Sequence, residues 1–207
     1  MKPDGIRNIL FDLGGVLLDI DYNRTEQAFR DLGFKDFDKM YSQFRADALF
    51  EKLETGHIKP EDFCNTLKER APQQVTESQI IAAWEAMILD FRKESLNYLT
   101  ELSKRYKLYL LSNTNELHIS ALRKQFAEQV SPGGWLDDYF TKAYYSSSIG
   151  LRKPHREVYD FVLEDAGIIA RETLFIDDSY NNIEAAAVLG LRTHLLLPEE
   201  RIEKLGL

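Results

Sequence analysis

The chain has 207 residues, 44% of them hydrophobic, and its 26 basic and 34 acidic side chains give a formal net charge of −8. A chain of this length buries about 70% of its unfolded surface, so it can form a full core without disulfides or a structural metal. The negative charge disfavours binding to nucleic acid and to anionic membranes, and we expect neither as a partner.

Short apolar runs recur along the chain and predict buried strands, because they are rich in branched or aromatic residues and too short for typical helices. In chain order they cover residues 6–11, 107–111, 140–145, 173–176 and 193–197. Helical patterns that end at Gly167 and Gly190 lie between the later runs. Strands that alternate with helices predict an α/β fold with a Rossmann-like, doubly wound parallel sheet.

The alternation is interrupted between residues 22 and 91, where we find helical periodicity and no convincing strand. Thr76 and Gln79 fit a capping box, and Pro60 suits the first turn of another helix. The apolar face of the helix after Thr76 is expected to carry Ile80, Trp84, Met87 and Ile88.

This block predicts an inserted helical cap domain over residues 19–94, with the core domain formed by residues 1–18 and 95–207. An insert that follows the first strand stands over the carboxyl edge of the sheet, where open α/β sheets bind ligands. It can therefore act as a lid and select the substrate.

Three of the predicted strands end in polar residues: Asp12 after the first, Ser112-Asn113-Thr114 after the second, and Asp177-Asp178 after the fourth. Because a parallel sheet gathers such ends along one edge, a carboxylate nucleophile, a hydroxyl and an acidic pair for a hard cation are expected to meet there.

Two further groups would complete a phosphate site. Asn113, with Glu116 three residues on, is expected to begin a helix whose first amides suit phosphate. Lys153 adds a mobile positive charge ahead of the next helix.

Each of these residues also has an ordinary structural interpretation. An Asp at a strand end often caps a turn, and Ser112-Asn113-Thr114 alone can be a helix cap. A Lys before Pro is usually solvated. Asp177-Asp178 is harder to explain in this way, because adjacent buried carboxylates repel each other unless a cation or base compensates.

The order of the four motifs resembles that of the haloacid dehalogenase-like (HAD) hydrolase superfamily, and the likeness covers essentially the whole chain. The matching segments are residues 11–17, 111–115, 152–154 and 175–179. Within the superfamily the chain resembles bacterial sugar-phosphate phosphatases that act on α-glucose 1-phosphate, which share the Asp-Leu-Gly opening and the Ser-Asn-Thr-Asn segment.

The resemblance implies a HAD-like core with a small helical cap, and a Mg²⁺-dependent phosphatase acting on a small-molecule phosphate ester. We expect a cytoplasmic location, because no run approaches the ~20 apolar residues of a spanning helix and residues 1–5 lack the start of a secretory signal. It implies that Asp12 takes the phosphoryl group and that water then hydrolyses the aspartyl phosphate. Mg²⁺ would be held by Asp12, the backbone carbonyl of Gly14 and the acidic pair. Asp178 is the favoured direct ligand, and Asp177 would bind directly or through water.

Ser112, Asn113 and Lys153 would bind the phosphate, and Asn182 stands at a further motif position where it would hold a metal-bound water. Physical chemistry agrees with these roles, since attack by a carboxylate on a phosphoryl group requires the charge on three oxygens to be offset.

Gly14 departs from the family pattern, because most phosphatases of this superfamily carry a second Asp there as general acid and base. Losing such a group typically lowers the rate by ~10²–10⁴. The anomeric hydroxyl of a sugar is more acidic than an ordinary hydroxyl, so an ester at this oxygen tolerates the absence of the general acid better. This favours a sugar 1-phosphate over a 6-phosphate.

Several polar or aromatic residues in or near the cap have two interpretations. Asp19 and Asp21 bind sugar hydroxyls or replace the lost acid in one interpretation, and form a solvated hinge in the other. His118 is expected at the surface and Cys64 in the core. Aromatic residues of the block are expected in the cap core rather than on a sugar-stacking surface: Trp84, Phe29, Phe44 and Phe63.

Two other functions remain open from the sequence. One is a metal-independent haloacid dehalogenase, against which Asp177-Asp178 argues. The other is a catalytically weak or silent protein that binds a phosphometabolite after losing the acid at Gly14. A receiver domain is rejected because its acidic pair lies near the amino terminus and it has no helical insert.

Overall fold

The computed structural model describes residues 4–42 and 45–207. Its centre is a five-stranded sheet in the order β7-β6-β1-β8-β9, in which every neighbouring pair is parallel. The strands are β1 (Asn8–Phe11), β6 (Lys107–Ser112), β7 (Lys142–Tyr145), β8 (Thr173–Asp177) and β9 (Arg192–Leu195). All five predicted strands are present with small shifts at their ends, and the predicted fold class is confirmed.

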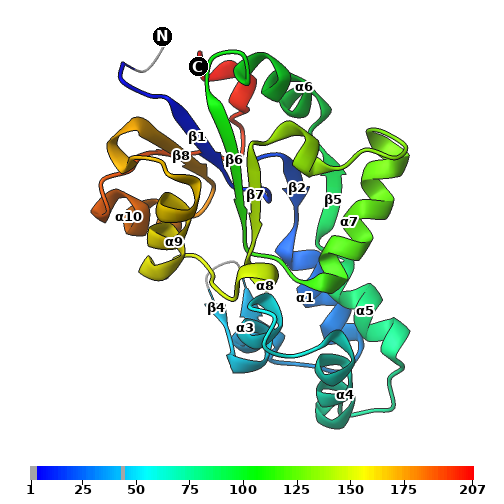
Figure 1. Ribbon diagram of the computed structural model, residues 1–207. Coiled ribbons are helices and arrows are strands. Elements are labelled where there is room, and N and C mark those ends of the chain that lie inside the picture. Colours follow the sequence, from blue (N-terminus) through cyan, green and yellow to red (C-terminus); the bar gives the residue numbers. More distant parts are fainter. Residues whose placement is uncertain (1–3, 43–44) are drawn as a thin grey trace.

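Helices cover both faces of this sheet, which explains why its strands are continuous apolar runs (Figure 1). The helices of one face are α6 (Lys93–Leu102) and α7 (Glu116–Gln129), and those of the other are α9 (Arg156–Ala166) and α10 (Tyr180–Val188). The core domain also contains short helical segments: η1 (Leu136–Tyr139), α8 (Ser146–Ile149), η2 (Ala170–Glu172) and, after β9, η3 (Ile202–Lys204).

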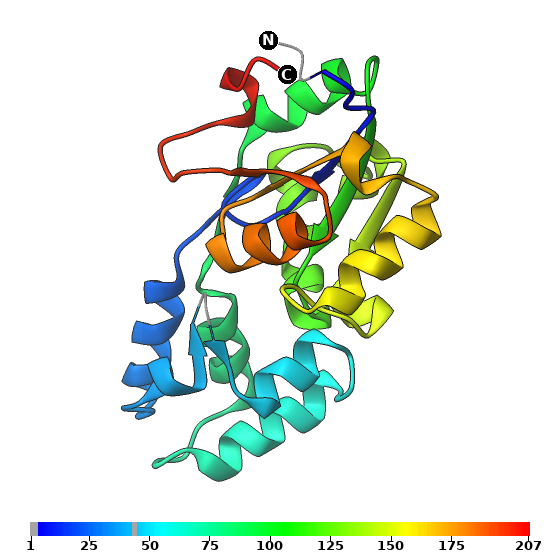
Figure 2. The same cartoon turned by 90° about the vertical axis from the view of Figure 1, so that its left-hand side faces the viewer.

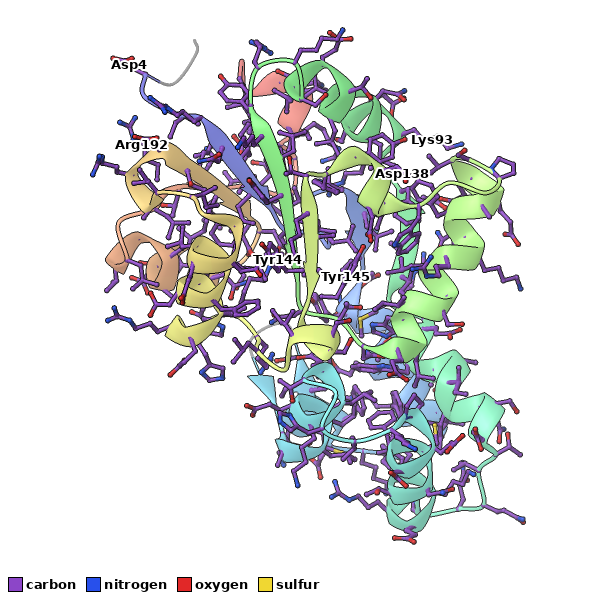
Figure 3. All side chains as sticks on the ribbon, in the orientation of Figure 1. Asp4, Lys93, Asp138, Tyr144, Tyr145 and Arg192 are labelled. Atoms are coloured by element: carbon purple, nitrogen blue, oxygen red, sulfur yellow. The ribbon has the colours of Figure 1, made fainter. Side chains whose placement is uncertain are left out.

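Alternate side chains of each strand point to opposite faces. In β1, Ile9 and Phe11 pack with α6 and α7, whereas Leu10 packs with α9 and α10. In β7, the adjacent Tyr144 and Tyr145 belong to these two separate clusters and are labelled in Figure 3. The sheet therefore divides the core domain into two hydrophobic layers.

The predicted helical block lies beyond the carboxyl edge of the sheet, away from both chain ends (Figures 1 and 2). Its elements are α1 (Tyr22–Asp31), α2 (Phe37–Met40), β3 (Tyr41–Ser42), β4 (Arg45–Ala46), α3 (Ala48–Glu54), α4 (Pro60–Arg70) and α5 (Glu77–Glu85). The expected capping box at Thr76 and Gln79 is present, and Pro60 opens α4, so both local predictions are confirmed.

The cap has a hydrophobic core of its own, separate from the two layers of the sheet. Phe29, Phe63 and Trp84 are fully buried in it, as is Cys64, so they belong to the cap core as expected. Phe44 lies outside the described residues.

A two-stranded antiparallel ribbon connects the cap to the core. It pairs β2 (Leu18–Ile20) with β5 (Ile88–Phe91), the two segments by which the chain enters and leaves the cap. The expectation of no strand between residues 22 and 91 is therefore wrong, and α5 ends before Met87 and Ile88. The ribbon escaped detection because each strand is defined by a partner roughly seventy residues away, which local periodicity does not reveal.

Arg92 holds the two connecting segments together from the core side. Its Nε donates to Asp19 Oδ1 at 2.7 Å, and its Nη1 donates to the carbonyl oxygens of Gly15 at 2.6 Å and Val16 at 3.2 Å. The side chain of Arg92 is largely buried. The hinge of the cap is thus tied to the loop that follows β1.

The cap boundaries at residues 18/19 and 94/95 stay a prediction. Among the described residues, no helix combines the length and the apolar character needed to cross a membrane.

We expect Phe63→Ala to destabilise the protein by about 3–5 kcal/mol, because it opens a cavity in the cap core. Phe161→Ala is the control, since Phe63 is 0% and Phe161 36% exposed, and we expect it to have a clearly smaller effect. Urea unfolding of both variants measures the difference. Equal losses would contradict a tightly packed cap core.

Candidate active site

The polar ends of three neighbouring strands form the centre of the site. Asp12 follows β1, Ser112 ends β6 and Asp177 ends β8, and β1 lies between the other two strands in the sheet. The register pairs Phe11 with both Leu110 and Ile176, so the three polar residues leave the sheet at nearly the same level. The cavity at this edge is also lined by the cap.

Lys153 is buried between two of the carboxylates. Its Nζ lies 2.7 Å from Asp12 Oδ1 and 2.7 Å from Asp177 Oδ2, and the residue is 1% exposed. Burial alone would lower the pKa of Lys153, but the charges of Asp12 and Asp177 outweigh it and the pKa is raised. Lys153 is therefore a fixed cation, and the expectation of a mobile charge is wrong.

Asn113 fixes the backbone of Lys153. Its Nδ2 donates to the Lys153 carbonyl at 2.9 Å, and its Oδ1 accepts from the Lys153 amide at 2.9 Å. The cap of α7 is Asn115, whose Oδ1 accepts from the His118 amide, so the expected helix start at Asn113 is wrong. Asn113 and Asn115 are both suitable capping residues by type. Their roles differ because Asn113 is bound to a loop forty residues away.

Three carboxylates can hold a metal at this point. Asp12, Asp177 and Asp178 each offer an oxygen, and the three atoms lie within 4.8 Å of one another. Burial, together with Asp177 and Asp178, raises the pKa of Asp12 to about 8 against the opposing charge of Lys153. Burial and Asp177 raise the pKa of Asp178 to about 6. This cluster of hard, mutually repelling oxygen donors fits Mg²⁺.

The carboxylate of Asp177 already accepts several hydrogen bonds besides that of Lys153. Oδ1 accepts from the Ser179 amide at 2.8 Å and from Asn182 Nδ2 at 3.0 Å, and Oδ2 lies 3.1 Å from the same nitrogen. These bonds favour contact with a metal through water over direct ligation. They also commit the Asn182 amide to Asp177.

Two glycines allow the β1 loop to pass close to its neighbours. A Cβ at Gly14 would lie 2.2 Å from Ile20 Cδ1, so the place of the family's second acid is filled by an apolar side chain. Gly15 has φ +68°, and a Cβ there would lie 2.3 Å from Asp178 Oδ2. The need for Gly15 was missed, although a Gly-Gly pair after a strand is a signal of such an approach.

Ser112 is buried at the cavity wall, and the backbone beside it is held by a residue that the sequence interpretation missed. Ser146 Oγ accepts from the Thr114 amide at 2.8 Å and donates to the Thr114 carbonyl at 2.9 Å. No local pattern marks Ser146, because its partner lies on the loop of the neighbouring strand.

The cap contributes four polar residues to the cavity wall, Tyr22, Tyr41, Ser42 and Glu54, all missed as site residues. Tyr41 donates to Glu54 Oε1 at 2.9 Å, and Glu54 Oε2 lies 2.9 Å from Arg152 Nη2. Glu54 is 2% exposed, and burial raises its pKa against the pull of Arg152 and Tyr41. Its spacing of four from Phe50, on the buried face of α3, is the signal that could have identified it.

His118 is buried, so its expected surface position is wrong. Its Nε2 lies 3.0 Å from the Trp84 carbonyl oxygen, and its ring stacks on the Trp84 indole at 4.6 Å. Burial lowers the pKa of His118 to about 4, which keeps the imidazole neutral. The cap residue Trp84 covers this position, which α7 alone would leave to solvent.

Asp19 and Asp21 do not line this cavity. Asp19 pairs with Arg92 at the hinge, and Asp21 caps α1 by accepting from the Asn23 amide at 3.0 Å. The other predicted site residues do meet there: Asp12, Gly14, Ser112, Asn113, Lys153, Asp178 and Asn182 line the cavity, with Asp177 behind Lys153.

Comparison with known proteins identifies relatives over nearly the whole chain. A family model described as haloacid dehalogenase-like hydrolase matches residues 6–190. The chain is 36% identical to a D-ribitol-5-phosphate phosphatase from Bacteroides thetaiotaomicron, over 91% of this chain and 90% of that protein.

Solved structures agree with this result. A HAD family enzyme from Bacteroides thetaiotaomicron in complex with magnesium and inorganic phosphate is 36% identical, with a TM-score of 0.85 over 97% of this chain and 98% of that one. A HAD-like family hydrolase from Porphyromonas gingivalis is 33% identical, with a TM-score of 0.84 over 94% of this chain and 93% of that one.

We expect Gly15→Ala to weaken Mg²⁺ binding by about 10- to 100-fold, because the added methyl displaces Asp178. Gly167→Ala is the matched control: its φ of +62° carries similar backbone strain, and its Cβ would meet nothing within 4 Å. Calorimetric titration with Mg²⁺ compares the two variants. Equal affinities would show that Asp178 does not need the gap at Gly15.

We expect His118 to make the protein less stable as the pH falls from 6.5 to 4. Its folded pKa of about 4 lies below the usual 6.5, so the unfolded chain binds more protons in this range and stability is lost on acidification, by up to about 3 kcal/mol. His118→Gln keeps a donor and does not titrate, so it should flatten this part of the stability profile. An unchanged slope in chemical denaturation would contradict a neutral His118.

Proposed function

The chain belongs to the haloacid dehalogenase-like hydrolases, and from that premise we propose that it hydrolyses the phosphate ester of a sugar or sugar alcohol through an aspartyl phosphate on Asp12. It is a phosphoric monoester hydrolase, and related structures hold magnesium with phosphate. The observation that carries the proposal is the short contact of 2.7 Å between Lys153 Nζ and Asp12 Oδ1, beside two further carboxylates.

Lys153 orients the Asp12 carboxylate for attack on phosphorus. The Lys153 charge, the Ser112 hydroxyl and nearby backbone amides would meet the phosphoryl oxygens. Asp12, Asp178 and the Gly14 carbonyl would hold Mg²⁺, which offsets phosphoryl charge when bound. Asp177, through its bonds to Lys153 and Asn182, keeps this arrangement in place.

The alcohol part of the substrate would face the cap. Tyr22, Tyr41 and Glu54 line the cavity on that side and offer polar groups suited to sugar hydroxyls. The relative from Bacteroides thetaiotaomicron supports a sugar-alcohol phosphate as the substrate class. α-Glucose 1-phosphate stays a prediction that depends on leaving-group acidity, whereas D-ribitol 5-phosphate is an ester of a primary alcohol.

Asp12→Asn should lower Mg²⁺-dependent phosphate release by about 10³-fold or more, because the neutral amide is not a nucleophile. Asp160→Asn, at an exposed carboxylate on α9, is the control and should retain full activity. Phosphate release is measured with Mg²⁺ and with chelator. Full activity in Asp12→Asn or in chelator would exclude this mechanism, and halide release without metal would point to a dehalogenase.

A panel of α-glucose 1-phosphate, glucose 6-phosphate and D-ribitol 5-phosphate tests the substrate class. If leaving-group acidity decides, α-glucose 1-phosphate has the highest kcat/KM; faster cleavage of the primary esters would reject that argument. Binding of all three without turnover would identify a silent phosphometabolite-binding protein instead.

A further inference from the structure

The alcohol that leaves during phosphoryl transfer needs stabilisation, and position 14 does not supply it. Negative charge develops on the ester oxygen as its bond to phosphorus breaks. Ile20 Cδ1 occupies the space beside Gly14 where the family's acid would project. A donor for this oxygen must therefore come from elsewhere in the cavity.

The geometry of the reaction indicates the side from which a donor must come. Attacking and leaving oxygens lie roughly in line through phosphorus, so the leaving oxygen points away from Asp12. The cap stands beyond the edge of the sheet that carries Asp12 (Figure 1). A donor on the cap side of the cavity is therefore placed to reach it.

Several donors near this position already have partners. Lys153 donates to Asp12 and Asp177, and the Tyr41 hydroxyl donates to Glu54. His118 has its Nε2 against the Trp84 carbonyl, and a neutral ring has no second N–H.

Tyr22 is different, because the structure shows no hydrogen bond between its hydroxyl and any described residue. It is the first residue of α1, directly after the capping Asp21, and it lines the same cavity as Asp12. Its ring lies against that of Tyr41, with centroids 6.2 Å apart. The helix start and the ring contact position the phenol at the cap wall.

The surroundings of Tyr22 keep its hydroxyl protonated. Burial and the negative charges of Asp178, Asp12 and Glu54 raise its pKa well above the usual 10. Tyr22 lines the same cavity as Asp12 and Asp178, so its side chain borders the reaction centre. Tyr22 is thus a permanent donor.

We propose that the Tyr22 hydroxyl donates a hydrogen bond to the ester oxygen of the leaving alcohol and replaces part of the function of the acid absent at Gly14. The inference depends on the proposed function. Asp12 forms the new bond to phosphorus, the electrons of the broken P–O bond pass to the ester oxygen, and the departing alkoxide takes its proton from water. The phenol keeps its own proton throughout.

Tyr22→Phe tests this with two substrates, because it removes one oxygen and keeps the ring. We expect kcat/KM for D-ribitol 5-phosphate to fall by about 10- to 100-fold. The loss for p-nitrophenyl phosphate should stay below about threefold, since nitrophenolate leaves without help. The ratio of the two losses isolates a leaving-group role from a general disturbance of the site.

Tyr98→Phe is the matched control, because its hydroxyl donates to the Leu207 carbonyl in the core domain and it does not line the cavity. It should leave both reactions unchanged. Equal losses on both esters in Tyr22→Phe, or no loss on either, would overturn the inference. Wild-type protein that cleaves neither ester would reject the proposed function itself. Thermal unfolding of Tyr22→Phe confirms that the variant is folded.

Discussion

The site depends on one buried ammonium group held between two carboxylates. Burying a charge is strongly unfavourable unless it is paired and hydrogen-bonded, and Lys153 meets this condition through Asp12 and Asp177, each at 2.7 Å. Asp12 follows β1, Asp177 ends β8, and Lys153 belongs to the loop before α9, which Asn113 binds from the end of β6. This single ion cluster therefore joins the chain segments that form the reaction centre.

The same cluster suits a divalent cation. Three carboxylates lie close together and Lys153 contacts two of them, so burial and the excess negative charge raise the pKa of Asp12 and of Asp178. Asp12, Asp178 and the Gly14 carbonyl would hold a hard cation here, whose positive charge would offset this repulsion. The cluster also requires a glycine at position 15, since Asp178 occupies the space that a Cβ would take.

The cap completes the cavity and is tied to the core by charged contacts. Arg92 joins the hinge to the loop after β1, and the buried pair of Glu54 and Arg152 joins α3 to the residue beside Lys153. The segment that enters the cap also determines what lies around Gly14. Ile20, on the strand that enters the cap, removes the room for an acid, and Tyr22, two residues later, brings a phenol to the cavity.

The sequence by itself determined the parallel sheet, the position of the cap and the convergence of Asp12, Ser112 and Asp177-Asp178, because strand periodicity and the polar ends of strands are local signals. Tertiary structure decided which asparagine caps α7, that His118 and Lys153 are buried, that β2 pairs with β5, and that Glu54 and Tyr22 face the cavity. Most of these features depend on partners distant in sequence, so no local pattern contains them; Glu54 is the exception, because its spacing from Phe50 places it on the buried face of α3. The position of a polar residue at a strand end predicts its chemical role. Its charge state and its mobility depend on the residues that pack around it, as for Lys153 and His118.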